Sequence, residues 1–238
     1  MIFTEIDIII AHIYRFSKNE KIAKEHKEMD KEPTNSNANS TALMHKRVFK
    51  LVLLAILAAV IVVLQYFGAA LKVGPFNLTF TLIPVVLGAA ILGIPEGAGL
   101  GFLFGLITLI NCINGADIGG AMMFAANPFA TSFVCLFKGT MAGLVPAIIC
   151  KALEKRETLG VILASLSAPV VNTGIFCIFL PIFFMDIFKQ WAAGTNLFIY
   201  MFTGLIGINF LIEFLVNALL ATTLAFVVNV IKHKMKLG

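Results

Sequence analysis

The sequence predicts an all-α integral membrane protein, a bundle of six transmembrane helices with both termini in the cytoplasm. Hydrophobic residues make up 59% of the 238 residues and charged residues only 13%, about half the charged share of a soluble domain. The charges are also unevenly placed, because only 13 of them fall in the 184 residues from 48 to 231. Such continuously apolar runs are predicted to be helices, since a backbone in lipid must satisfy its own hydrogen bonds.

The first 45 residues differ in composition from the rest. Residues 18–32 are highly charged, and residues 33–41 (PTNSNANST) have the polar composition of a flexible linker. We therefore expect a polar, disordered N-terminal tail over residues 1–45 and a membrane domain over residues 46–238. The segment MHKRVFK, which starts at Met44, leads directly into the first span. One hypothesis is that Met44 is the biological start.

Six apolar segments follow this tail. A membrane-spanning helix needs roughly 20 apolar residues, so the second segment is short and the sixth is long enough to tilt. The predicted spans are residues 48–70, 78–92, 97–113, 128–153, 159–185 and 197–231.

Basic residues predict the orientation, because loops on the cytoplasmic side carry an excess of Lys and Arg. With six spans, three basic groups share one side, and the opposite side has only Lys72 and Lys189. Both termini are therefore predicted to be cytoplasmic. The three groups are Lys46, Arg47 and Lys50; Lys151, Lys155 and Arg156; and Lys232, Lys234 and Lys236.

Ionisable side chains inside spans are costly and so indicate function or specific packing. Lys138 and Glu213 both fall near the middle of a predicted span. Asn209, Glu213 and Asn217 recur at every fourth residue and share one helix face. Two interpretations stay open: Lys138 and Glu213 form a buried pair that fixes the bundle, or one or both face a ligand cavity.

Further polar residues gather at the predicted outer ends of the spans. The segment 114–127 (NGADIGGAMMFAAN) is rich in Gly, Ala and Met and is either a lid over a cavity or a passive connector. Together, the span and loop residues give one set of candidate ligand-binding side chains: Asn77, Thr79, Asn111, Asn127, Lys138, Asn172, Asn209 and Glu213.

Several chemistries lack their sequence signatures. There is no GxxxxGK[ST] loop for ATP hydrolysis, and no HExxH, GxSxG or Cys/His arrangement. The four histidines lie in the tails and the four cysteines are scattered, so we predict no catalytic residues and no metal site. The basic residues form no stripe for nucleic acid. We therefore predict a protein that is not an enzyme and holds no cofactor of its own.

Small residues recur at every fourth position in three spans, which lets another helix approach closely. Ala55 and Ala59 do so in the first span. The glycines of the third and fourth spans are expected to pack inside this protein: Gly97, Gly101, Gly105, Gly139 and Gly143.

Four features together resemble the substrate-binding S components of energy-coupling factor (ECF) vitamin transporters, over about residues 44–238. Ala55-Ile-Leu-Ala-Ala59 matches the AxxxA signature of the first span. Residues 74–109 resemble the hairpin of the second and third spans, with Pro84 inside the helix and a Gly-rich return. Residues 127–153 resemble the fourth span, and the six-span topology matches.

The resemblance implies a location, partners and a mechanism. An S component lies in the bacterial cytoplasmic membrane, binds a water-soluble vitamin from outside, and docks through its AxxxA face, here Ala55 and Ala59, on a transmembrane coupling subunit. Two cytoplasmic ATPase subunits consume the ATP. The S component then topples and releases its vitamin inside. The second and fourth spans most resemble those of family members for pantothenate, then riboflavin. Lys138 also favours pantothenate, because it could pair with the carboxylate of that vitamin.

One alternative remains from a different class. A self-sufficient, ion-coupled secondary transporter or channel would work without partner subunits, and its transport would depend on Glu213 or Lys138.

Overall fold

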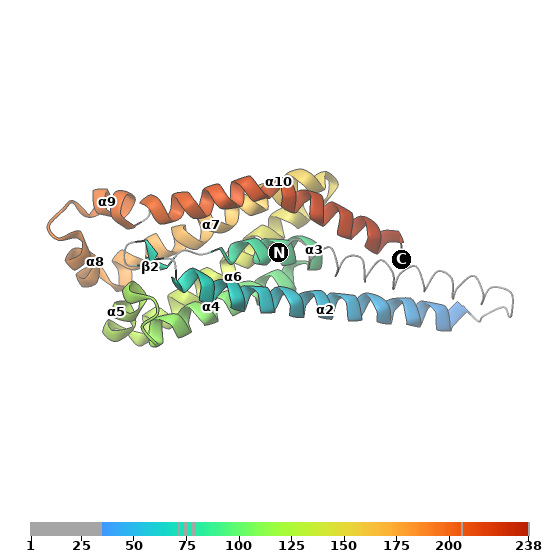
Figure 1. The fold of residues 1–238 in the computed structure, drawn as a ribbon, viewed down its shortest axis with the longest axis horizontal. Helices are drawn as coiled ribbons and strands as arrows, with labels where there is room; N and C mark the ends of the chain where they lie inside the picture. Colours follow the sequence, from blue (N-terminus) through green and yellow to red (C-terminus); the bar gives the residue numbers. More distant parts are fainter. Residues whose placement is uncertain (1–34, 71, 74–75, 78–79, 206, 238) are drawn as a thin grey trace. The chain divides into compact units, whose positions relative to one another are not determined.

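The computed structural model describes residues 35–70, 72–73, 76–77, 80–205 and 207–237. The chain divides into two compact units, Met1–His45 and Lys46–Gly238, and the helical bundle lies in the second. Almost all described residues are helical, which confirms the predicted all-α class. The long helices are α2 (Asn35–Ala70), α4 (Ile94–Ile113), α6 (Pro128–Ala152), α7 (Glu157–Phe183) and α10 (Gly207–Leu237) (Figure 1).

Shorter elements connect these helices. α3 spans Leu82–Leu92, α5 spans Ile118–Ala126, α8 spans Met185–Ala192 and α9 spans Leu197–Tyr200. A 3₁₀ turn, η1 (Glu154–Arg156), joins α6 to α7, and a π-helical turn, η2 (Met201–Leu205), follows α9. The strands β1 (Lys72–Val73) and β2 (Phe76–Asn77) pair antiparallel, with Lys72 opposite Asn77. α5, α8, α9 and β2 lie at one end of the bundle (Figure 1).

Five of the helices in the described part of the chain are long and apolar enough to cross a membrane. They correspond to the predicted first, third, fourth, fifth and sixth spans. The predicted second span differs, because α3 has only 11 residues and rises about 16 Å, against about 30 Å of hydrocarbon. Before it, Lys72–Val73 and Phe76–Asn77 pair as the short strands β1 and β2, outside the predicted spans.

Three other boundaries differ from the expectation. α2 already begins at Asn35, within the segment that we expected to be tail, while residues 1–34 lie outside the described residues. The predicted sixth span is divided into α9, η2 and α10. Most of the segment 114–127, taken from sequence as a loop, forms α5.

Two side-chain caps account for the start of α5 and of α6. The Oδ1 of Asp117 accepts a hydrogen bond from the backbone N–H of Gly120, at 2.9 Å. The Oδ1 of Asn127 accepts one from Ala130, at 3.1 Å, and Pro128 fills the first turn of α6. Such caps satisfy the free N–H groups of a helix start. They let a Gly-rich and Ala-rich segment form a helix where composition suggested a connector.

Glycines bring α4 and α6 into backbone contact, which confirms that these glycines pack inside the protein. A Cβ added at Gly139 would lie 2.6 Å from the carbonyl oxygen of Gly101 and 2.7 Å from the Cα of Gly105. At Gly105 the added atom would meet the carbonyl oxygen of Cys135. These neighbours are backbone atoms, so they cannot move aside as a flexible side chain would.

We expect Gly139→Ala to destabilise the bundle by about 1–3 kcal/mol, the usual cost of overpacking a tight interface. Gly99→Ala is the matched control on α4, because its added Cβ meets nothing within 4 Å. That change should be neutral or stabilising, since Ala favours helix over Gly by about 1 kcal/mol. Thermal unfolding in one detergent measures both variants. Equal stability of the two would contradict the steric account.

The apolar core consists of two clusters. The α3 cluster joins α2, α3, α4, α6, α7 and α10, and includes Val85 and Phe104. The α8 cluster joins α5, α6, α7 and α8, and includes Val134 and Phe188. α3 is almost wholly buried, so a helix too short to span the membrane is held by its neighbours on every side.

Candidate functional site

A layer of polar side chains separates the two apolar clusters. On α6, Val134 belongs to the α8 cluster and Ala142 to the α3 cluster, and Lys138 lies midway between them. On α7, Asn172 lies between Ala168 of the α3 cluster and Leu180 of the α8 cluster. On both helices, a polar residue therefore lies between the segment that packs in one apolar cluster and the segment that packs in the other.

The helices α4 and α10 also have buried polar residues next to members of the α3 cluster. On α4, Asn111 follows Ile107 by one turn and is buried. On α10, Glu213 and Asn217 are both buried and precede Leu224 of the α3 cluster. We call these five residues the polar layer: Asn111, Lys138, Asn172, Glu213 and Asn217. All except Asn217 are candidate ligand-binding residues from the sequence, and those four come from four separate spans.

Lys138 is half-buried in this layer. Its Nζ lies 5.5 Å from the ring centroid of Phe176, one turn beyond Asn172 on α7. The electron-rich face of an aromatic ring attracts a cation, and the cation keeps its positive charge. Lys138 is also within electrostatic range of Cys112 and Cys135, whose sulfur atoms lie 3.9 Å apart between α4 and α6. The ammonium is therefore held where α4, α6 and α7 meet.

Two amide oxygens of the polar layer have no partner among the described residues: Oδ1 of Asn172 and Oδ1 of Asn217. Asn217 donates through Nδ2 to the backbone oxygen of Glu213, at 2.8 Å. Leaving a buried acceptor unpaired costs about 1–3 kcal/mol. A ligand that donates hydroxyl or amide hydrogens would recover this cost.

One other predicted site residue, Asn127, stands apart from this layer. Asn127 is exposed, and its side chain caps α6. The side chains of Asn77, Thr79 and Asn209 lie outside the described residues, so their role as ligand contacts stays a prediction. Asp117, which caps α5, is within electrostatic range of the same two cysteines as Lys138.

Sequence reasoning missed a buried network on α2. Gln65 donates through Nε2 to the hydroxyl of Thr108, at 2.8 Å, and accepts through Oε1 from the hydroxyl of Thr81, at 2.7 Å. All three side chains are buried. The signal was present, because Gln65 is the one amide side chain in the apolar run of residues 51–70.

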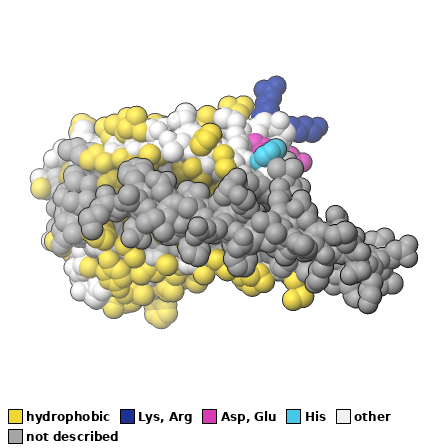
Figure 2. Space-filling view, turned by 45° about the vertical axis from the view of Figure 1, so that its right-hand side comes forward, with side chains coloured by type: hydrophobic (Ala, Val, Ile, Leu, Met, Phe, Trp, Pro, Cys, Tyr) yellow, Lys and Arg dark blue, Asp and Glu magenta, His cyan; other side chains and the backbone are white. Residues whose placement is uncertain are grey.

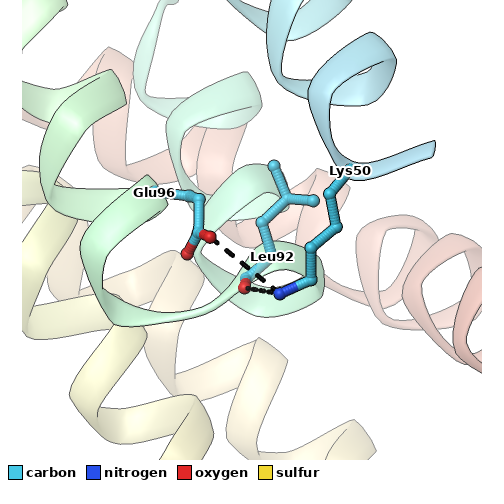
Figure 3. A network of polar contacts seen from close by, with 3 residues as sticks. All are labelled: Lys50, Leu92 and Glu96. Carbon is cyan, nitrogen blue, oxygen red and sulfur yellow. Dashed lines mark hydrogen bonds and ion pairs between the residues drawn. The ribbon is translucent and has the colours of Figure 1, made fainter. Parts of the chain in front are cut away.

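A second polar contact fixes the other end of α2. The Nζ of Lys50 donates to the backbone oxygen of Leu92, at 3.4 Å, and lies 3.9 Å from a carboxylate oxygen of Glu96 (Figure 3). Lys50 therefore binds the turn between α3 and α4. Lys50 and Gln65 attach α2 to the bundle at two separate heights.

The opposite face of α2 is open. Leu57 and Ile61 are buried in the α3 cluster, whereas Ala55 and Ala59 are exposed on the other side of the helix. Only 17% of the most apolar part of α2 is buried, and hydrophobic side chains are spread over the face drawn in Figure 2. The predicted docking residues thus lie on an exposed helix face beside larger exposed apolar side chains such as Ile56 and Val60.

Comparisons with known proteins show the family of this chain. The family "ECF transporter, substrate-specific component" matches residues 49–227. A pantothenic acid transporter, PanT, from Lactococcus lactis subsp. cremoris (strain MG1363) is 27% identical over 186 residues, which cover 72% of this chain and 89% of the relative. The chain therefore belongs to the ECF transporter substrate-specific component family, and this membership confirms the prediction of a multi-pass cell-membrane transport protein that is not an enzyme.

Proposed function

We propose that this chain binds pantothenate in the polar layer and passes it through the membrane with the help of an ECF coupling subunit and two ATPase subunits. The observation that carries the ligand proposal is the half-buried ammonium of Lys138 between the two apolar clusters. The name of the Lactococcus lactis relative, a pantothenic acid transporter, supports the same ligand.

The chemistry of pantothenate fits the polar layer. Its carboxylate would pair with Lys138, since a charge-assisted hydrogen bond is about twice as strong as a neutral one. Its hydroxyl and amide hydrogens would serve the unpaired oxygens of Asn172 and Asn217. Riboflavin, the second candidate, is neutral and would leave the ammonium without an anion.

The proposed partner surface is the open face of α2. Ala55 and Ala59 would let a helix of the coupling subunit approach closely, as small residues do in other membrane helix pairs. No ATP-binding loop occurs in the sequence, so the ATP would be consumed by the partner subunits.

We also propose six membrane crossings with both termini in the cytoplasm. Gln65 and Lys50 lie 15 residues apart on α2, about 22 Å along a helix. The segment from Thr81, which bonds to Gln65, to Leu92, which bonds to Lys50, runs back along most of this length. α3 and the β1–β2 hairpin would therefore complete one crossing antiparallel to α2, and basic residues would gather on the cytoplasmic side.

The ligand is tested by purifying the full chain in mild detergent and identifying the small molecules that accompany it by mass spectrometry. We expect pantothenate to be released on denaturation, and added pantothenate to raise the midpoint of thermal unfolding. Riboflavin should do neither. Stabilisation by riboflavin but not by pantothenate would reject the ligand proposal while leaving family membership intact.

Coupling is tested in liposomes. The chain alone should accumulate no pantothenate with either an ion gradient or ATP, whereas the chain with its coupling and ATPase subunits should accumulate it when ATP is supplied. Accumulation by the isolated chain under an ion gradient would favour the alternative of a secondary transporter.

A further inference from the structure

An apolar groove runs between the ends of α6 and α7, away from the polar layer. It has a volume of about 500 Å³. Its lining includes Ile149 of α6, Leu153 just after α6, Leu163, Leu166 and Val170 of α7, and Phe214 of α10. Ser167 also lines it, but the hydroxyl of Ser167 donates to the backbone oxygen of Ala164, at 2.8 Å. The groove therefore offers a ligand almost nothing except hydrocarbon contacts.

The length of the groove is close to one leaflet of a membrane. A Cβ added at Gly160 would lie 3.1 Å from the Cβ of Leu153, so one end of the lining lies at the level of Gly160. Val170, at the other end, lies ten residues beyond Gly160 on α7, about 15 Å along a helix. One leaflet of hydrocarbon is also about 15 Å deep, and α6 and α7 are both long and apolar enough to span the membrane, so an acyl chain fits the groove by length and chemistry.

Basic residues flank Leu153, which lines one end of this groove. Lys151, Lys155 and Arg156 are exposed on either side of Leu153, and Lys232 of α10 is within electrostatic range of Cys150 at the same end of α6. Glu154 and Glu157 lie in the same segment, so four basic residues outnumber two acidic ones. Figure 2 shows Lys and Arg side chains at one end of the molecule, beside acidic side chains.

We propose that this groove and its basic rim form a binding site for an anionic phospholipid. One acyl chain would lie against Leu163, Leu166 and Phe214, and the phosphate would lie by Lys151 and Arg156. A zwitterionic lipid would fill the groove as well but gain less at the rim, since each Lys or Arg near an anionic headgroup contributes about 1 kcal/mol. The site concerns the lipid alone and does not depend on the identity of the vitamin.

The test compares two lipids with identical acyl chains, dioleoyl phosphatidylglycerol and dioleoyl phosphatidylcholine. Each is titrated into the full chain in detergent, and bound lipid is counted by native mass spectrometry. We expect the first to bind about tenfold more tightly. Lys151→Gln with Arg156→Gln should remove most of this preference. The control, Arg47→Gln with Lys189→Gln, loses the same charge on α2 and α8 and should keep it.

A second pair of variants tests the groove itself. Leu163→Trp should weaken binding of both lipids, because the indole fills the space of the acyl chain. Ile178→Trp places the same bulk on an exposed part of α7 outside the groove and should change neither. Equal binding of the two lipids by the unmodified protein, or equal losses in the two charge variants, would overturn the proposal. Loss of coupling-subunit binding in Leu163→Trp with unchanged lipid binding would also overturn it, in favour of a protein occupant.

Discussion

Replacing both Ala55 and Ala59 with tryptophan should abolish transport while leaving pantothenate binding within about twofold of the unmodified protein. Two indoles on the open face of α2 would hold a partner helix several ångströms away, and the close contact of small residues would be lost. A central contact of an interface commonly contributes about 2–4 kcal/mol. We therefore expect binding of the coupling subunit to fall by about a hundredfold or more, measured by co-purification.

The matched control is Leu215→Trp with Leu219→Trp. These two residues are exposed on α10 and have the same four-residue spacing, so the control adds comparable bulk to another lipid-facing helix. It should transport normally. Transport that survives in the Ala55 and Ala59 variant would show that the partner docks elsewhere, and loss in both variants would point to a general effect of bulk.

The second large effect concerns the ligand. Lys138→Met keeps most of the length of the side chain and removes its charge. Pantothenate binding should weaken by about tenfold or more, because a hydrogen bond between charged groups contributes about 1.5–3 kcal/mol. Isothermal titration calorimetry on the purified chain measures the change.

Two controls separate charge recognition from a structural role. The uncharged alcohol analogue of pantothenate lacks the carboxylate, so its affinity should be nearly equal for the unmodified protein and for Lys138→Met. Lys189→Met makes the same substitution on the exposed helix α8 and should leave pantothenate binding unchanged. An equal loss of affinity for both ligands in Lys138→Met would mean that the lysine only stabilises the bundle.

Much of the fold could be predicted from the sequence because lipid imposes strong rules. The five long helices follow from the apolar runs, and the packing of α4 on α6 follows from glycines at every fourth position. The candidate site was partly predictable for the same reason. Lys138, Asn172 and Glu213 stood out because polar side chains are costly at mid-span. Along α6 and α7, Lys138 and Asn172 lie between residues of the two apolar clusters, and Glu213 is buried on α10.

Other features depend on contacts between distant segments. The apolar run before Leu92 does not reveal that its helix starts only at Leu82, since its burial among five other helices replaces contact with lipid. The pairing of Gln65 with Thr81 and Thr108 requires three elements to meet, which no local pattern encodes. The helix α5 starts at the side-chain cap of Asp117 and ends where the backbone N–H of Asn127 donates to Met123, which its Gly-rich composition does not reveal.

The short, enclosed helix α3 has a consequence for how the chain enters the membrane during synthesis. α2 is long, apolar and mostly free of neighbours, so it can leave the translocon and rest in lipid by itself. α3 cannot, because 11 residues do not reach across the hydrocarbon and lipid offers no substitute for the surrounding helices. We expect α3 to be retained until α4 and α6 have emerged, so that this middle part of the chain integrates as one unit after the first helix.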